Sequence, residues 1–199
     1  MEEVREEVNE KEFLFLEESI NSKLIPTPKL LIKDHKKPDK NGNFPSRLVV
    51  PATNFAAGFP RIGYLGIKRI FDENDIVYNN NTIIQASDLK EDLEKLALKR
   101  DETTILSLDI EAMYPSIKFD VVKKAVKFFA KNLEREELRK IETCLEMIKF
   151  GMSNTLLTFQ DKFFKYGGNC NANKRGLTIG GYESAWLADL VAAFISNTA

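Results

Sequence analysis

The sequence predicts a mixed α+β protein, and three observations support this prediction. Apolar residues recur at helical spacing in several segments, whereas the shorter segments between them are rich in β-branched or alternating apolar residues. Hydrophobic residues make up 43% of the 199 positions, which is enough to build a core and excludes a disordered or collagen-like chain. A chain of this length forms one large domain or two small subdomains.

The first half of the chain combines helices with one hairpin. Pro26 and Pro28 end a charged N-terminal helix, and a turn at 39–43 separates two short apolar segments that we expect to pair. Ser87 is a candidate N-cap for the helix that begins there. We expect helices at 3–20, 61–71 and 87–98, and strands at 29–32 and 46–50.

The second half opens with the strongest strand pattern in the chain, at 103–110, which ends in a Tyr114-Pro115-Ser116 turn. Apolar residues at helical spacing follow from about Phe119. We expect helices starting near 119, at 134–150 and at 178–195, and a hairpin at 155–168 that turns around Gln160 and Asp161.

The formal net charge of −1 conceals a separation of charge along the chain. Residues 1–18 carry eight acidic and two basic side chains, whereas residues 23–70 carry ten Lys or Arg and only two Asp. Residues 71–105 are again acidic, and residues 106–199 are slightly basic. The basic block coincides with the predicted first hairpin, and its charge suits contact with phosphate groups.

Several classes of protein are excluded or disfavoured by composition. The chain has one histidine, His35, and two cysteines, too few ligands for a four-ligand zinc site and too few cysteines for a disulfide framework. A Ser-His-Asp or Cys-His mechanism would need His35, which lies among lysines. No secretory signal is visible, and the longest apolar run, 185–195, is shorter than the roughly 18–20 residues of a membrane helix. We therefore expect a soluble, intracellular protein with no membrane contact.

Asp109 is the first candidate functional residue. It ends the predicted strand, and Glu111 lies on the same side if the strand continues. A carboxylate at a strand end is a suitable Mg²⁺ ligand, although a solvated acid is the simpler interpretation of this pattern alone. Tyr114 follows five residues after Asp109, where its ring would lie over whatever the acid binds.

A glycine-rich segment is the second candidate. Residues 176–190 follow the pattern Gly-x3-Gly-x3-Ser-x2-Leu-Ala, with Gly176 and Gly180 as the spaced glycines. Glycines ahead of a helix let the backbone approach a ligand closely, and a helix N-terminus favours phosphate. The alternative is a loop that simply enters a core helix.

The predicted basic hairpin is the third candidate. It contains six Lys or Arg and two Asp between residues 29 and 47, within a chain that is nearly neutral. Its basic side chains are Lys29, Lys33, Lys36, Lys37, Lys40 and Arg47, with His35 among them. A solvated surface is the usual explanation for such a run of charge.

The order of the three candidates resembles the reverse transcriptase family. A basic hairpin with an arginine on its return strand, then Leu-Asp-Ile-Glu-Ala-Met-Tyr-Pro-Ser-Ile, then the glycine pattern correspond to the fingers hairpin, motif A and motif B of that family. The likeness is greatest to reverse transcriptases of mobile elements of the Penelope-like or non-long-terminal-repeat kind. It implies a right-hand polymerase fragment with an acidic N-terminal helix (1–23), a fingers-like subdomain (24–104) and a partial palm (105–199).

The resemblance also implies a role for each matching residue. Asp109 would be catalytic and would ligate two Mg²⁺ (or Mn²⁺) ions, one shared with the Ile110 carbonyl. The incoming deoxynucleoside triphosphate would be bound by Glu111, Ala112, Met113, Tyr114, Arg47, Lys33 (or Lys36), Gly176 and Gly180, with Tyr114 as a steric gate against a 2′-hydroxyl. The RNA template and DNA primer would be contacted by Lys36, Lys37, Lys40 and Arg175.

The sequence departs from the family pattern in one important respect. The Asp-Asp pair that supplies the second metal-binding aspartate occurs nowhere in the 199 residues. Arg175 also stands where motif B often begins with Gln, and Glu111 adds a charge to motif A. We therefore expect the parent protein to be an active polymerase and the 199-residue chain alone to be inactive.

Three alternatives compete with this interpretation. The chain could be a non-catalytic nucleic-acid-binding domain derived from a reverse transcriptase, or an RNA-dependent RNA polymerase, which the aromatic Tyr114 disfavours. It could also be an unrelated intracellular α+β domain, which would not bind an RNA–DNA hybrid. The sequence does not indicate template specificity, priming mode or oligomeric state.

Overall fold

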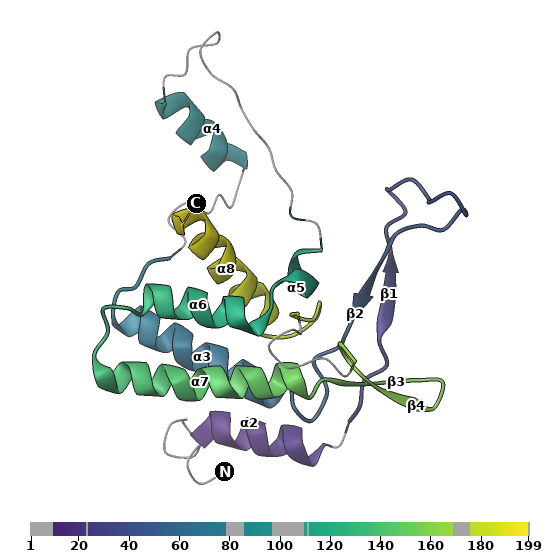
Figure 1. The fold of residues 1–199 in the computed structure, drawn as a ribbon, viewed down its shortest axis with the longest axis horizontal. Helices are drawn as coiled ribbons and strands as arrows, with labels where there is room; N and C mark the ends of the chain where they lie inside the picture. Colours follow the sequence, from purple (N-terminus) through teal and green to yellow (C-terminus); the bar gives the residue numbers. More distant parts are fainter. Residues whose placement is uncertain are drawn as a thin grey trace.

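The structure is a computed structural model that describes residues 10–22, 24–78, 86–96, 110, 112–168 and 176–198. These residues form seven helices and two antiparallel hairpins, which confirms the predicted α+β class. The larger helices lie together on one side of the molecule, and both hairpins project from the other (Figure 1).

Four helices build the main core: α3 (Gly58–Glu73), α6 (Phe119–Phe129), α7 (Arg135–Ser153) and α8 (Ser184–Thr198). The helix α7 runs alongside α3, and α8 packs on α6 (Figure 1). The buried residues of α7 recur at helical spacing, as predicted, and each large apolar side chain so buried contributes about 1.5–3 kcal/mol. Fully or nearly fully buried core residues include Ile67, Phe71, Val122, Val126, Ile141, Leu145, Ile148, Leu187, Leu190 and Val191.

This core contains residues from both sides of the predicted boundary at 104. Ile67 and Phe71 of α3 belong to the same cluster as Val122 of α6 and Leu187 of α8. The segments expected to form separate fingers-like and palm-like parts therefore share one hydrophobic core. Residue 104 itself lies outside the described residues.

The helix α2 (Glu10–Asn21) covers α3 on the side away from α8 (Figure 1). Its fully buried Leu16 packs against Ile62 of α3 and Met147 of α7. Glu12 forms an ion pair with Arg69 across the two helices, with 2.5 Å between oxygen and nitrogen. Of the helix predicted at 3–20, residues 3–9 lie outside the described part of the chain.

The two hairpins agree with the sequence prediction. In the first, β1 (Lys29–Ile32) pairs with β2 (Ser46–Val49), with Leu31 opposite Arg47. In the second, β3 (Leu156–Phe159) pairs with β4 (Lys162–Lys165). Gln160 and Asp161 both have positive φ, 49° and 59°, which is the conformation of a type I′ turn.

Two helices begin at positions that the sequence did not predict. The helix α3 starts at Gly58, so Gly58-Phe59-Pro60 is its first turn rather than a break, because proline is tolerated where backbone N–H groups have no helical partner. The helix α8 starts at Ser184 rather than at Thr178. The carbonyl of Ile179 instead accepts a hydrogen bond from the Val50 N–H at 2.8 Å, which keeps this stretch out of the helix.

The remaining elements are α4 (Ala86–Lys95) and α5 (Met113–Ser116), a single turn. The helix α4 stands away from the core (Figure 1), and Leu89 and Leu96, which are apolar at helical spacing, are exposed. Ser87 lies inside α4 and is not its N-cap. Residues 103–109 of the predicted strand lie outside the described residues, and Ile110 is exposed and not in a strand. Among the described helices, none combines the length and apolar character needed to cross a membrane.

Candidate functional site

The start of the glycine-rich segment, residues 176–181, contacts α5, the turn that contains Tyr114 and Pro115. The Leu177 N–H donates to the carbonyls of Tyr114 (3.0 Å) and Ile117 (3.2 Å), and Gly176 forms a bridge with Lys118. Gly176 lies so close to Pro115 that a Cβ atom at this position would overlap the Pro115 backbone. The short helix α5 is therefore held directly against the glycine-rich segment.

At its other end the same segment is joined to the base of the β1–β2 hairpin. Ile179 forms a parallel bridge with Val49, and its carbonyl accepts the Val50 N–H. Gly180 has φ +107°, a conformation that side chains rarely adopt, and a Cβ atom there would lie 2.6 Å from the Val50 carbonyl oxygen. At both spaced glycines, a side chain would overlap backbone atoms of another segment of the chain. The sequence alone had suggested that these glycines make room for a ligand.

The β1–β2 hairpin places Lys33 and Arg47 on one face. Cross-strand partners share a face, so Arg47 lies with Leu31, and alternation along the strand adds Val49. The Lys33 N–H donates to the Pro45 carbonyl at 2.8 Å, which continues the same register and puts Lys33 beside them. Val49, at the base of this face, contacts Gly180 of the glycine-rich segment.

The loop beyond this hairpin carries Lys36, Lys37 and Lys40 in exposed positions. Asp39 organises the loop, because its carboxylate accepts the backbone N–H groups of Asn41 (2.8 Å) and Asn43 (2.9 Å). The Asn43 and Asn41 hydrogen bonds hold the pKa of Asp39 below its usual value. Asp39, one of the two acids in the basic block, therefore shapes the turn and leaves Lys36, Lys37 and Lys40 available to contact an external group.

Around α5, Met113 and Tyr114 are half-buried against the main core, whereas Ile110 and Ala112 are exposed. Ala112 has φ +49° and ψ +43°, a left-handed conformation that costs a non-glycine residue about 1–2 kcal/mol. Such strain is concentrated at functional sites in proteins. The strained residue lies between Asp109 and Tyr114 in the sequence.

The structure brings together three of the predicted groups and leaves others apart. Gly176 and Leu177 contact the turn that carries Tyr114, Gly180 contacts Val50, and Lys33 and Arg47 share the hairpin face to which Val49 belongs. Lys36, Lys37 and Lys40 lie farther out, on the hairpin tip. Asp109, Glu111 and Arg175 are outside the described residues.

Glu183 is a notable residue that the sequence argument left without a role. It immediately precedes α8, is 6% exposed, and faces a small cavity of about 20 Å³ beside Asn54, Thr155 and Thr178. Its burial raises the pKa of the carboxyl group and outweighs the hydrogen bonds from its own backbone N–H and from Ser184 Oγ (3.4 Å), which lower it. An acid inside a glycine-rich, otherwise apolar segment was the signal available in the sequence.

Arg61 was also missed. Its guanidinium lies between two rings, 4.3 Å from the centroid of Phe15 and 4.7 Å from that of Tyr182. This stack links α2, the start of α3 and the glycine-rich segment. No local sequence pattern could have indicated it, because the three residues are far apart in the chain.

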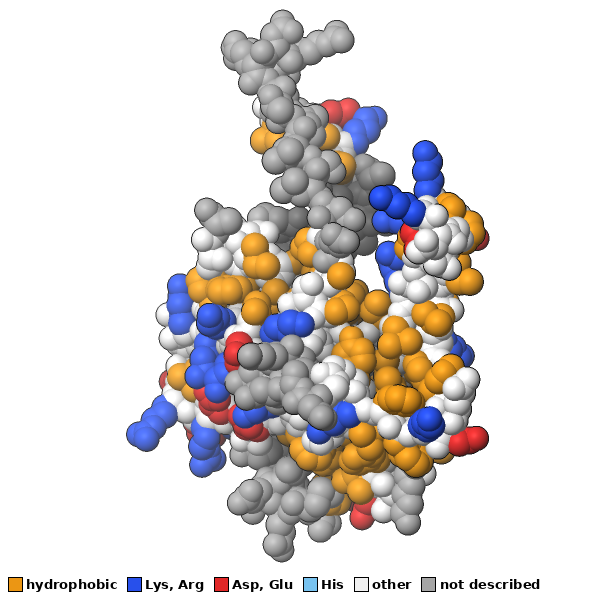
Figure 2. Space-filling view, turned by 45° about the vertical axis from the view of Figure 1, so that its right-hand side comes forward, with side chains coloured by type: hydrophobic (Ala, Val, Ile, Leu, Met, Phe, Trp, Pro, Cys, Tyr) orange, Lys and Arg blue, Asp and Glu red, His pale blue; other side chains and the backbone are white. Residues whose placement is uncertain are grey.

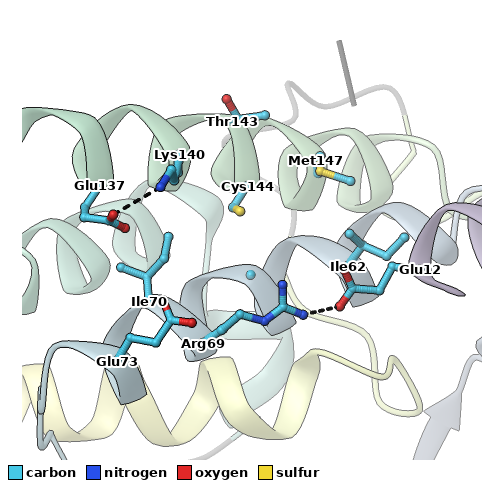
Figure 3. A pocket seen from close by; sticks show the side chains of 11 residues that line it. Glu12, Ile62, Arg69, Ile70, Glu73, Glu137, Lys140, Thr143, Cys144 and Met147 are labelled. Carbon is cyan, nitrogen blue, oxygen red and sulfur yellow. Dashed lines mark hydrogen bonds and ion pairs between the residues drawn. The ribbon is translucent and has the colours of Figure 1, made fainter. Parts of the chain in front are cut away.

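A larger pocket, of about 250 Å³, lies between α3 and α7 and is closed at one end by Glu12 of α2 (Figure 3). Arg69 and Lys140 point into it, but each is already in an ion pair, with Glu12 (2.5 Å) and Glu137 (3.1 Å) respectively. Cys144 and Met147 of α7 supply its apolar wall. None of the predicted site residues lines this pocket.

Among the residues that the structure describes, no group of three or more His, Cys, Asp or Glu side chains could hold a metal ion. The predicted metal ligand Asp109 is not one of those residues. Comparison of the chain with known protein families, with curated proteins and with solved structures finds no significant match.

Proposed function

We propose that this chain is part of an RNA-directed DNA polymerase that binds a deoxynucleoside triphosphate between the β1–β2 hairpin and α5. The observation that carries the proposal is the backbone of residues 176–181, which bonds to Val50 at one end and to Tyr114 at the other. This contact makes neighbours of three segments that are widely separated in sequence. Their order along the chain was the basis of the resemblance, and their proximity is what a single nucleotide site requires.

The side chains in this region suit a triphosphate. Lys33 and Arg47 lie on one hairpin face and form no ion pair with the described residues, so both are available to oxygen anions. Arginine binds phosphate through two parallel hydrogen bonds, and lysine adds a point charge. Tyr114 is held by the hydrogen bond to its carbonyl and by core packing, so its ring could support the sugar and exclude a 2′-hydroxyl.

In this proposal Asp109, with the Ile110 carbonyl, would hold Mg²⁺ (or Mn²⁺), which would supply electrostatic stabilisation of a phosphoryl group. The protein's own contribution is to position the nucleotide and to offset its negative charge through Arg47 and Lys33. No histidine, cysteine or serine nucleophile is needed, which is consistent with the composition.

The first test measures binding of an RNA–DNA hybrid at low ionic strength by fluorescence anisotropy. Lys36→Glu combined with Lys37→Glu should weaken binding and reduce its salt dependence, because phosphate contacts release counterions. Lys11→Glu combined with Lys124→Glu changes the net charge equally on exposed helical positions and is the matched control. Equal weakening by both pairs, or no binding of the hybrid, would contradict the proposal.

The second test asks whether the bound hybrid responds to the correct nucleotide. The primer carries a dideoxy end, so no bond can form, and the next complementary deoxynucleotide is added with Mg²⁺. The correct deoxynucleotide should tighten binding, whereas a mismatched nucleotide or the matching ribonucleotide should not. Asp109→Asn and Arg47→Ala should each remove the effect.

Two of the three alternative functions predict other outcomes of this second test. Hybrid binding that never responds to nucleotide would favour a non-catalytic nucleic-acid-binding domain. An equal response to deoxy- and ribonucleotides would favour an RNA-dependent RNA polymerase. Either result would overturn the proposal.

A further inference from the structure

The β3–β4 hairpin exposes aromatic side chains for which the proposed polymerase site has no use. Phe163 is 71% exposed, more than any other large hydrophobic side chain that the structure describes, and Phe159 and Phe164 are 53% and 48% exposed. Exposed apolar groups of this size, gathered on one element, mark binding surfaces. Figure 2 shows that hydrophobic side chains gather below the basic hairpin tip, on the side of the molecule that carries both hairpins.

The hairpin is attached at its base, so its backbone is held against the rest of the described structure. Leu157 is buried, and the Tyr166 N–H donates to the Thr155 carbonyl at 2.9 Å. The Thr158 N–H donates to the Pro26 carbonyl at 2.9 Å, which ties one edge of the hairpin to the chain that precedes β1. Rigid aromatic groups lose little conformational entropy on binding.

Each face of the hairpin combines a phenylalanine with a lysine. Phe163 is opposite Thr158, and Lys165 lies on the same face two residues on. Phe164, opposite Leu157, shares the other face with the Phe159–Lys162 pair. Neither Lys162 nor Lys165 forms an ion pair with the described residues, and the one acid of the hairpin, Asp161, is at the turn.

We propose that the β3–β4 hairpin is a binding platform for single-stranded nucleic acid, on which a base stacks against Phe163 and a phosphate contacts Lys165 on the same face. Aromatic side chains beside basic ones are the combination that single strands require, because unpaired bases expose their faces and the backbone is anionic. In a duplex those faces are covered by neighbouring bases. The platform lies outside the proposed nucleotide site and does not depend on polymerase activity.

Charge argues against the other occupants of this surface. A second copy of the chain that docked through the same hairpin would bring two sets of unpaired lysines together, and like charges repel. An apolar protein surface would remove water from both ammonium groups without pairing them, which is costly. A polyanion with planar groups satisfies the lysines and the rings at once.

The test uses the full chain and a fluorescein-labelled oligo(U) RNA of about 15 nucleotides. Titration is followed by anisotropy at low ionic strength, with divalent metals chelated and with no primer or nucleotide present. Phe163→Ala should weaken binding by roughly 5- to 100-fold, the range expected for loss of one stacked base. Phe44→Ala, which removes a phenylalanine that is 47% exposed from the loop between β1 and β2, is the control and should stay within about twofold of the original.

Two further variants separate stacking from general apolar contact. Phe163→Trp should keep binding, and its added emission should be quenched by the RNA, because an indole stacks on bases. Phe163→Leu keeps apolar area without a ring and should bind as weakly as Phe163→Ala. Thermal unfolding of each variant checks the fold, which a side chain this exposed should not disturb.

Several outcomes would overturn the platform. Absence of oligo(U) binding, equal affinity of Phe163→Leu and the original chain, or loss of binding with Arg47→Ala but not Phe163→Ala would each do so. Concentration-dependent dimerisation abolished by Phe163→Ala would instead assign the surface to a second copy. Because the probe lacks a primer and no nucleotide is present, its binding does not report on the proposed nucleotide site, so failure of the platform and failure of the polymerase proposal are distinguishable.

Discussion

Gly176 and Pro115 lie in backbone contact, so that the glycine-rich segment rests directly on the turn that carries Tyr114. The contact closes a continuous path from Val50 through Ile179 and Leu177 to α5. Substitution of Gly176 therefore tests the architecture of the candidate site without reference to any ligand.

Gly176→Ala should destabilise the chain by about 1–3 kcal/mol, because the added methyl group must displace the Pro115 backbone. The measurement is the free energy of unfolding from urea denaturation. Ser116→Ala, an exposed change in the same turn, is the control and should have an effect within about 0.5 kcal/mol. Equal stability of Gly176→Ala and the original chain would show that the two segments are not in contact.

Ala112→Gly should stabilise the chain by about 1 kcal/mol, because glycine adopts the left-handed conformation of this residue without steric cost. Ala193→Gly, in the middle of α8, should have the opposite sign and cost about 0.5–1 kcal/mol. Chemical denaturation of the two variants side by side is the measurement. A destabilising Ala112→Gly would indicate that the residue is not left-handed.

Glu183→Gln should stabilise the chain at neutral pH and have little effect at acidic pH. The burial of Glu183 raises the pKa of its carboxyl group in the folded state above the value in the unfolded state. The protonated form therefore favours folding below the unfolded-state pKa, and this contribution is lost as the pH rises through the folded-state pKa. At a pH above both pKa values, each tenfold change in the acid dissociation constant of Glu183 on folding lowers the free energy of unfolding by about 1.4 kcal/mol.

The measurement for Glu183 is the difference in unfolding free energy between the variant and the original chain across pH. This difference should grow as the pH rises from below the unfolded-state pKa. Ala185→Ser, an exposed change on the same helix that alters no titratable group, is the control and should show no such trend. A difference that does not change with pH would contradict the raised pKa of Glu183 in the folded chain.

Arg61→Met should destabilise the chain by about 1–2 kcal/mol, because each ring of the Phe15–Arg61–Tyr182 stack contributes roughly 0.5–1 kcal/mol. Methionine preserves the apolar stem but carries no charge. Arg139→Met, at an exposed position on α7, is the control and should be near neutral. Equal thermal stability of the two variants would contradict the stack.

Predictions from the sequence succeeded where one element carries its own signal. Ile141, Leu145 and Ile148 recur at helical spacing and are buried in α7 as expected. The turn at Gln160 and Asp161 was placed correctly because both strands next to it have a clear pattern. Helical spacing of apolar residues did not indicate burial everywhere, because Leu89 and Leu96 face solvent in the described structure.

Errors at helix ends have a different cause. Thr178 and Ile179 precede a segment with a helical sequence pattern. The Ile179 carbonyl nevertheless accepts a hydrogen bond from the N–H of Val50, which lies more than a hundred residues earlier in the chain. Gly58 and Pro60 look like a break, but the N–H group that Pro60 lacks would have no helical partner in the first turn of a helix. Local propensity cannot reveal a hydrogen-bond partner that only the folded chain supplies.

The sequence alone determined the α+β class, most of the elements and the order of the three candidate motifs, because periodicity and turn residues act over a few positions. The tertiary structure decided that α3, α6, α7 and α8 share one core, that Gly176 and Gly180 pack against Pro115 and Val50, and that Arg47 shares a hairpin face with Val49, which contacts Gly180. It also placed Glu183 in a cavity and Phe163 in solvent. These relationships join residues that are distant in the chain, and they exist only once burial of the core has fixed the segments against one another.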